Sequence, residues 1–188
     1  MNPLYDSFPD AVTVDGINYP IVTDFREWIK FYTLVESDIE PKQKALIMLE
    51  YFMDDIPKDA EKALCALADF LSARELYQGK DTKRRASNRL DVQAYSFTED
   101  AGDIYAGFLI HYGIDLSSVE YMHWYQFRVL FDSLPFESEI KQKMHYRTLN
   151  PESIKNKEER KRVREIQESI RLKNPRKQYV DDYDIVMV

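Results

Sequence analysis

Glycine is scarce in this chain, which has five glycines among 188 residues, well below the ~7 % that is usual in proteins. Phosphate-binding loops and β folds with many tight turns both need more glycine than this. Hydrophobic residues make up 44 % of the chain and aromatic residues 13 %, which argues against wholesale disorder. These numbers favour a mostly α protein with a real core.

Cysteine and histidine are also rare. The one cysteine, Cys65, excludes an internal disulfide and fits a reducing compartment. Because it lies in the apolar run 63–67, we expect it to be a small core residue. The three histidines are His111, His123 and His145. They are too scattered for a metal motif, so the sequence predicts no metal and no cofactor.

Catalytic motifs are missing as well, including nucleophile elbows, Walker loops and dinucleotide-binding glycines. Acid–base chemistry remains a weaker alternative, if Asp100, Asp103 and Asp115 approach His111 or His123. Helix capping and first-turn positions explain Asp100 and Asp103 without chemistry. The sequence therefore predicts a protein that is not an enzyme.

No apolar run approaches the ~20 residues that a membrane helix needs, and the N-terminus has no signal-peptide pattern. A soluble, cytoplasmic protein is expected. The net charge is −7, which makes nucleic acid an unlikely main partner. The charge is uneven, because residues 1–80 carry −7 whereas residues 135–179 carry +6.

Hydrophobic periodicity and capping signals predict a β-hairpin over 11–22, turning at Asp15-Gly16. The predicted helices cover 24–37, 42–53, 58–77, 98–112, 117–134, 136–146 and 151–173. Residues 1–150 are predicted to form a helical domain with a mobile loop at 79–93. Residues 151–188 are predicted to form a long charged helix and a flexible tail.

Two of the predicted helices carry specific local signals. The helix at 42–53 is apolar nearly all round, so we expect it to be buried on more than one side. Ser117 and Glu120 have the spacing of a capping box, which would start the next helix at residue 117.

The stretch 100–134 is dense in aromatic residues at helical spacing. Such a stripe is usually core. A partner-binding face remains open as an alternative, because helices 42–53, 98–112 and 117–134 all look apolar beyond a single face. The candidate partner-binding residues are Tyr105, Phe108, Tyr112, Trp124, Tyr125, Phe127, Arg128 and Phe131.

Basic residues form two clusters, one in the predicted loop and one on the last helix. Three interpretations are open: phosphate binding, a solvated helix with internal ion pairs, and head-to-tail self-association with the acidic front of another copy. The candidate basic face comprises Lys83, Arg84, Arg85, Arg89, Arg160, Arg162 and Arg164.

The segments DIYAGFLIHYGIDL, MHWYQFRVLFDSLP and HYRTLN, together with VDGINYPIVTDFREWIKF near the N-terminus, resemble a family of small tail-region proteins. This family occurs in siphophages and prophages of Gram-positive bacteria. Its genes usually sit between those of the tail tube and tape-measure proteins. The similarity spans roughly residues 10–150.

The resemblance implies a non-enzymatic tail assembly chaperone in the cytoplasm of the bacterial host. Such a chaperone would shield the tape-measure protein and recruit tail tube subunits. Two alternatives stay open: a structural component of the tail or its initiator complex, and a nucleic-acid-binding regulator acting through the basic clusters.

Overall fold

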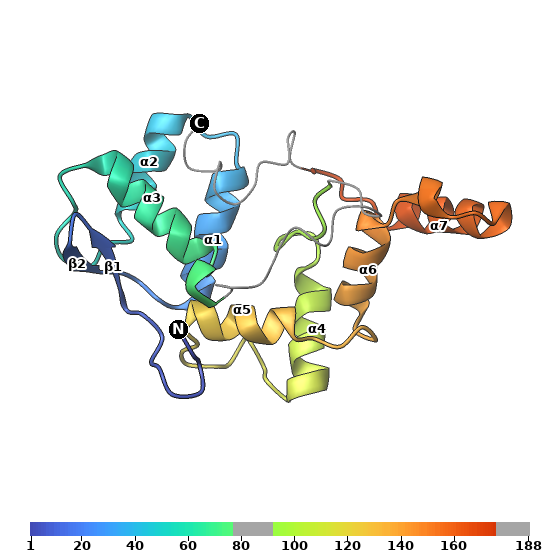
Figure 1. The fold of residues 1–188 in the computed structure, drawn as a ribbon, viewed down its shortest axis with the longest axis horizontal. Helices are drawn as coiled ribbons and strands as arrows, with labels where there is room; N and C mark the ends of the chain where they lie inside the picture. Colours follow the sequence, from blue (N-terminus) through green and yellow to red (C-terminus); the bar gives the residue numbers. More distant parts are fainter. Residues whose placement is uncertain (77–91, 176–188) are drawn as a thin grey trace. The chain divides into compact units, whose positions relative to one another are not determined.

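The computed structural model describes residues 1–76 and 92–175, and it confirms the expected mostly α class with an N-terminal β-hairpin (Figure 1). The elements are β1 (Ala11–Val14), β2 (Ile17–Pro20), α1 (Phe25–Glu36), α2 (Pro41–Leu49), α3 (Ala60–Leu71), the 3-10 turn η1 (Arg74–Leu76), α4 (Ala101–Tyr112), α5 (Trp124–Asp132), α6 (Glu139–Thr148), the 3-10 turn η3 (Pro151–Ser153) and α7 (Lys157–Ser169). The predicted loop 79–93 lies outside the described residues except for its last two positions, and the predicted tail 176–188 lies entirely outside them.

The hairpin has the predicted register and turn. Strands β1 and β2 pair antiparallel, with Val14 opposite Ile17 and Ala11 opposite Pro20. The two residues between the strands, Asp15 and Gly16, have φ angles of 50° and 80°. Two successive positive φ angles match the right-handed twist of the flanking strands, which is why Asp-Gly favours this turn.

The chain divides into two compact units. Among the described residues, the first unit contains 1–76 and 120–129, and the second contains 92–119 and 130–175. Helix α5 therefore contributes residues to both. This division differs from the predicted boundary at residue 150, because α7 packs against α6 and η3 inside the second unit.

The core of the first unit is aromatic. Trp28 is fully buried, and its ring centroid lies 4.6 Å from that of Phe70 and 5.0 Å from that of Phe31. Its indole N–H donates to the carbonyl of Val22 at 2.7 Å. The indole N–H of Trp124 donates to Leu71 O at 2.9 Å. Both indoles are thus buried without leaving a polar atom unsatisfied.

The second unit packs α4 against α6. Phe108, Phe131 and Ile140 are fully buried in it. Gly107 permits the close approach, because a Cβ at this position would lie 3.1 Å from Leu134 Cδ1. Helix α4 ends at Tyr112, as the sequence predicted, and Gly113, with a φ of 66°, is its left-handed C-cap.

Helix α5 begins at Trp124 and not at Ser117, so the predicted capping box is wrong. The Ser117 hydroxyl donates to Asp115 Oδ1 at 2.6 Å instead of capping a helix. Residue 123 forms an isolated β-bridge with Asp24, and Trp124 N donates to Thr23 O at 2.8 Å. This tertiary backbone pairing holds residues 122–124 outside a helix and overrides their local preference.

The predicted helix over 151–173 is interrupted. Pro151–Ser153 form the 3-10 turn η3, and α7 starts only at Lys157. Asn156 is the reason, because its side chain accepts hydrogen bonds from the backbone N–H groups of Glu158 and Glu159. An Asn that caps the first turn fixes the start of a helix at that point.

Candidate functional site

The predicted partner-binding residues lie mostly in the interior. Trp124, Tyr125 and Phe127 are at most 2 % exposed in the first unit, and Phe108 and Phe131 are fully buried in the second. Their packing is largely aromatic: Phe127 stacks on Phe25, for example, with a ring separation of 5.0 Å. The structure therefore uses these five rings as core, the more usual role of such a stripe.

The other three members of the set are half-buried. The Tyr105 hydroxyl donates to Asp115 Oδ1 at 3.1 Å, and the Tyr112 hydroxyl donates to Leu130 O at 2.9 Å. Arg128 donates to Leu71 O at 3.2 Å and lies over the Trp124 ring. Each of these polar groups has a partner within its own unit.

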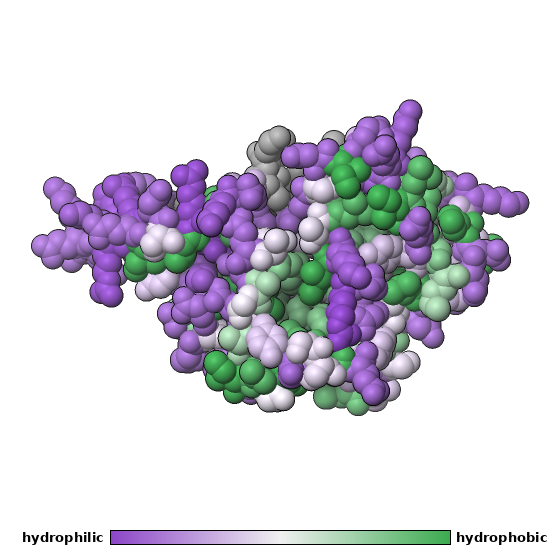
Figure 2. Space-filling model, turned by 180° about the vertical axis from the view of Figure 1, so that it is seen from behind, coloured by the Kyte–Doolittle hydropathy of each residue, from purple (hydrophilic) through white to green (hydrophobic). Residues whose placement is uncertain are grey.

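Exposed apolar side chains gather instead around α2. Within α2, Met48 is the one buried residue, whereas Leu46 is 68 % and Ile47 40 % exposed. Hydrophobic residues are visible in this region at the upper right of Figure 2. We call this set the α2 surface; it comprises Ile39, Leu46, Ile47, Met53 and Ile56.

The α2 surface corrects the prediction that this helix would be buried on more than one side. A short helix that is apolar all round normally has neighbours on several sides. Here α2 packs against α1 and α3, yet Leu46 and Ile47 are exposed among the residues that the structure describes. Hydrophobic periodicity could not reveal which side of α2 would be covered, because this helix is apolar nearly all round.

The chain around the α2 surface is acidic. Residues 36–61 contain eight Asp or Glu and three Lys. The ammonium of one of these lysines, Lys44, donates a hydrogen bond to Val35 O at 2.9 Å. The exposed apolar side chains therefore stand in a negative field, which favours a partner that carries positive charge beside its own apolar residues.

A smaller set of exposed apolar residues lies in the second unit. Leu109 and Ile110 of α4 are 42 % and 74 % exposed, and Phe136 is 55 % exposed. Helix α4 was among the helices predicted to be apolar beyond one face, and these two residues account for the excess.

A groove of about 680 Å³ lies between β1 and α3 in the first unit. Cys65 lines it and is exposed, so its prediction as a core residue is wrong. Partial desolvation of the thiol, together with the carboxylates of Glu61, Asp69 and Asp59, raises its pKa. A raised pKa disfavours the thiolate, so Cys65 lacks the activation of a nucleophile.

His123 has a structural environment. Its Nδ1 accepts from the backbone N–H of Tyr125 at 3.0 Å, so Nε2 carries the proton and donates to Pro9 O at 2.9 Å. The ring stacks on Phe8 at 5.0 Å. Burial lowers the pKa of this imidazole, against the opposing effects of the Pro9 carbonyl and Asp10. His123 is a neutral, hydrogen-bonded core residue.

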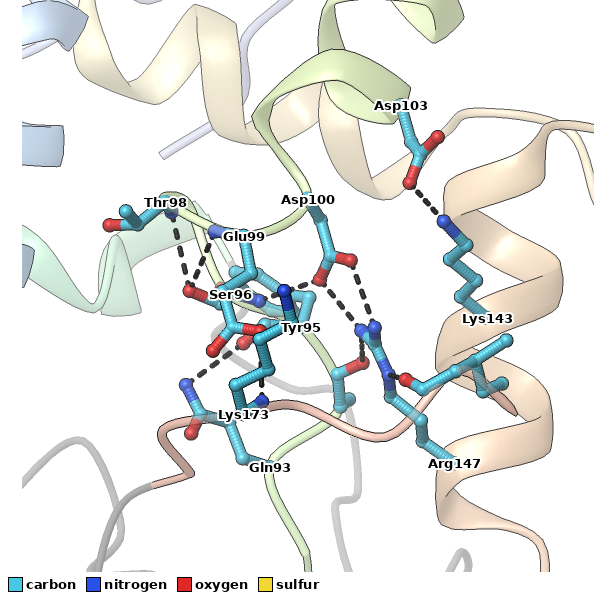
Figure 3. Close-up of polar contacts among 12 residues, drawn as sticks. Gln93, Tyr95, Ser96, Thr98, Glu99, Asp100, Asp103, Lys143, Arg147 and Lys173 are labelled. Atoms are coloured by element: carbon cyan, nitrogen blue, oxygen red, sulfur yellow. Dashed lines mark hydrogen bonds and ion pairs between the residues drawn. The ribbon is translucent and has the colours of Figure 1, made fainter. Parts of the chain in front are cut away.

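The acidic residues considered for acid–base chemistry have structural partners too (Figure 3). Asp100 forms an ion pair with Arg147, and Asp103 forms one with Lys143, both from α6. Hydrogen bonds from Ser117 lower the pKa of Asp115 to about 2, with smaller contributions from Ser118 and Tyr105. The second unit thus gives each of these carboxylates a donor partner.

The predicted basic face is only partly described. Lys83, Arg84, Arg85 and Arg89 lie outside the described residues. On α7, Arg160 and Arg164 both pair with Glu152, while Arg162 is exposed. Internal ion pairs therefore take up two of the three described arginines, which weakens the positive field available for phosphate binding.

Residues 1–76 and 92–175 contain no group of three or more His, Cys, Asp or Glu arranged to hold a metal ion. In the same part of the chain, no helix combines the length and the hydrophobicity needed to cross a membrane.

The fold and these surfaces define a mostly helical protein whose apolar excess is exposed on α2 and α4. The family model described as Bacteriophage Gp15 protein matches residues 4–172. The chain belongs to this family, and it is therefore a phage protein. No curated protein and no solved structure matches it.

Proposed function

We propose that this protein is a non-enzymatic tail assembly chaperone that binds the tape-measure protein and helps to recruit tail tube subunits. The proposal places it in the cytoplasm of the bacterial host during virion assembly. Its family supports a phage role, and the resemblance of its aromatic segments to tail-region proteins supports the tail. The observation that carries the binding role is the α2 surface.

The α2 surface suits a chaperone because it is apolar and accessible at once. Leu46 and Met53 expose about two thirds of their surface, at 68 % and 66 %. Contiguous exposed apolar side chains rimmed by polar residues are typical of protein-binding sites. A long helical client such as a tape-measure protein would aggregate through its own apolar stripes, and covering them would lower the free energy by ~25 cal/mol per Å² of apolar surface.

Co-expression with the tape-measure protein of the same phage tests the proposal. The wild-type chain should increase the soluble fraction of the tape-measure protein and co-purify with it. Leu46→Lys should reduce the co-purified amount by about tenfold, because a charge would be buried against the client's apolar stripe. Leu4→Lys is the matched control, since Leu4 is 90 % exposed and lies outside the α2 surface.

Two results would contradict the proposal. Equal co-purification by wild type and Leu46→Lys would exclude the α2 surface as the client site, and no co-purification by either would exclude the partner. A third measurement tests whether the chain stays in the mature virion. Mass spectrometry of purified particles should find no copies of it. Stoichiometric copies in mature virions would indicate a structural component of the tail instead.

A further inference from the structure

We propose that the free edge of strand β1 binds an extended segment of a partner chain, and that this segment joins the hairpin as a third strand. The site is the groove of about 680 Å³ between β1 and α3. No residue of the α2 surface lines this groove, and the inference does not depend on the tape-measure protein being the client. Its basis is a set of backbone groups that the fold leaves unpaired.

The hydrogen bonds of the hairpin alternate along β1. Ile21 N donates to Asp10 O at 3.0 Å, so these two opposite residues form a hydrogen-bonded pair. In an antiparallel ladder such pairs alternate with non-bonded pairs, and the register therefore puts Ala11 and Thr13 in non-bonded positions. The backbone N–H and C=O groups of Ala11 and Thr13 consequently point away from β2.

These outward-facing groups have no partner within the protein. In the part of the chain that the structure describes, no hydrogen bond reaches the backbone N–H or C=O of Ala11 or Thr13. Thr13 is exposed, Ala11 is half-buried, and both line the groove. Two donors and two acceptors thus stand along the groove at the two-residue spacing of a β-ladder. The complementary ligand is another backbone in the extended conformation, whose own N–H and C=O groups alternate in the same way.

The outer edge of β2, in contrast, is closed at one end. Pro20 has no N–H to donate, and its carbonyl already accepts from Met53 N at 3.0 Å. Proline and local cover both keep an edge strand from pairing with another chain. Strand β1, with the sequence AVTV, contains neither proline nor a charged residue. Of the two edges of the hairpin, β1 is therefore the one that is open to pairing.

Helix α3, which packs against β1 (Figure 1), supplies the opposite wall of the groove. Glu61, Lys62, Cys65, Ala66 and Asp69 line it, and their spacing places them on one face of the helix. A volume of about 680 Å³ falls within the ~300–1,000 Å³ that is usual for small-ligand sites. This is room for an extended segment of a few residues and too little for a helix.

The groove sets two chemical requirements for the partner segment. The segment is rich in β-branched residues and lacks proline where it faces β1, because it must be extended and must donate hydrogen bonds. It also lacks acidic side chains, because the charged residues of the lining are acidic except for Lys62, and like charges on neighbouring strands repel.

The test uses a neutral, fluorescein-labelled peptide of the sequence Gln-Val-Thr-Val-Thr-Gln, titrated with the full-length chain and followed by fluorescence anisotropy. One control peptide is N-methylated at both valines and a second at both threonines. Successive N–H groups of a strand point to opposite edges, so each control loses the donors of one edge only. One control should bind about tenfold more weakly than the parent peptide, and the other should bind like the parent.

Two matched variants locate the site on the protein. Thr13→Pro removes an N–H from the free edge of β1, and we expect an affinity about tenfold lower. Asn18→Pro removes an N–H from the other edge of the same hairpin and should leave the affinity unchanged. Both variants lose the hydrogen bond from Thr13 Oγ1 to Asn18 Oδ1, so this loss cancels in the comparison. If either variant unfolds, the methylated peptides still decide, because they leave the protein unchanged.

The inference is overturned if the parent peptide does not bind, if all three peptides bind equally, or if the two folded proline variants bind equally. Sedimentation of the unliganded chain tests a different occupant. Self-association that Thr13→Pro abolishes would show that a second copy fills the site, and it would overturn the assignment to a partner. Deletion of residues 176–188 tests the end of the chain itself, and a tenfold gain in peptide affinity would assign the site to that segment instead. Failure of the proposed function appears separately, in the Leu46→Lys co-purification.

Discussion

The guanidinium of Arg147 binds the carboxylate of Asp100 through two hydrogen bonds, of 2.6 Å from Nη1 to Oδ2 and 2.9 Å from Nη2 to Oδ1 (Figure 3). Both side chains are buried, at 8 % and 3 % exposure. Arg147 also donates to Ala94 O at 3.1 Å and to Ile170 O at 2.8 Å. One arginine thereby connects the chain before α4, the start of α4 and the end of α7.

Arg147→Met should destabilise the second unit by ~3–5 kcal/mol, because it leaves the Asp100 carboxylate buried without its partner. Lys143→Met is the matched control on the same helix. Its ion pair with Asp103 is more open, with side-chain exposures of 24 % and 25 %, and its loss should cost ~1 kcal/mol or less. Urea unfolding followed by circular dichroism measures both, and equal losses would contradict the special role of Arg147.

Trp124→Ala should cost ~3–5 kcal/mol, the usual range for removing a large ring from a core. Trp124 is fully buried, and its N–H bond to Leu71 O would be lost as well. Leu46→Ala, at an exposed position, should change stability by less than ~0.5 kcal/mol. Thermal unfolding of the wild type and the two alanine variants measures these changes. A Trp124→Ala variant as stable as the wild type would place Trp124 at an interface and not in the core.

Two glycines, one in the first turn of α4 and one at its C-cap, should respond to alanine in opposite directions. Gly113→Ala should cost ~1–2 kcal/mol, because a Cβ is disfavoured at its φ of 66°. Gly102→Ala should stabilise by ~0.5–1 kcal/mol, since its φ is not positive and the alanine favours the helix. A Cβ meets nothing within 4 Å at either position, so denaturant midpoints would report backbone preference alone. A loss of stability at both positions would contradict the prediction of opposite responses.

Stability should fall as pH drops below about 6.5, partly through His123. Burial lowers the pKa of His123 from its ordinary value of 6.5 in the folded chain. As pH falls, the unfolded chain therefore takes up a proton at this histidine before the folded chain does. The contribution of His123 to stability is complete above pH 6.5 and declines below it. His123→Asn should flatten the loss of thermal stability between pH 7.5 and 5.5, whereas His111→Asn, at an exposed histidine, should not. Identical pH profiles for all three chains would exclude His123.

Local signals predicted local structure well. The Asp15-Gly16 turn, the start of α1 next to Asp24 and the end of α4 at residue 112 are all as expected, because each depends on a few adjacent residues. Predictions that depended on distant partners were less successful. Helix α5 starts late because residues 122–124 pair with 23–25, and no pattern in the sequence shows that pairing.

The sequence could not separate buried from exposed apolar residues. It marked the aromatic stripe around Trp124 and the uniformly apolar α2 as candidates for either role. The structure buries the first and exposes Leu46 and Ile47 of the second. It also moves Cys65 from the expected core to the wall of a groove. Each outcome depends on which elements pack together, and that information lies in contacts between residues far apart in the chain.

By itself, the sequence determined the mostly α class, the hairpin and a few helix termini, such as both ends of α1 and the end of α4, since backbone propensities and caps act over a few residues. It also carries the segments that resemble tail-region proteins. Only the tertiary structure decided that Arg147 would meet Asp100, that β1 and α3 would enclose an acidic groove, and that α2 would keep an apolar face in water. Burial and charge pairing are properties of the assembled fold, because they are set by neighbours that folding brings together.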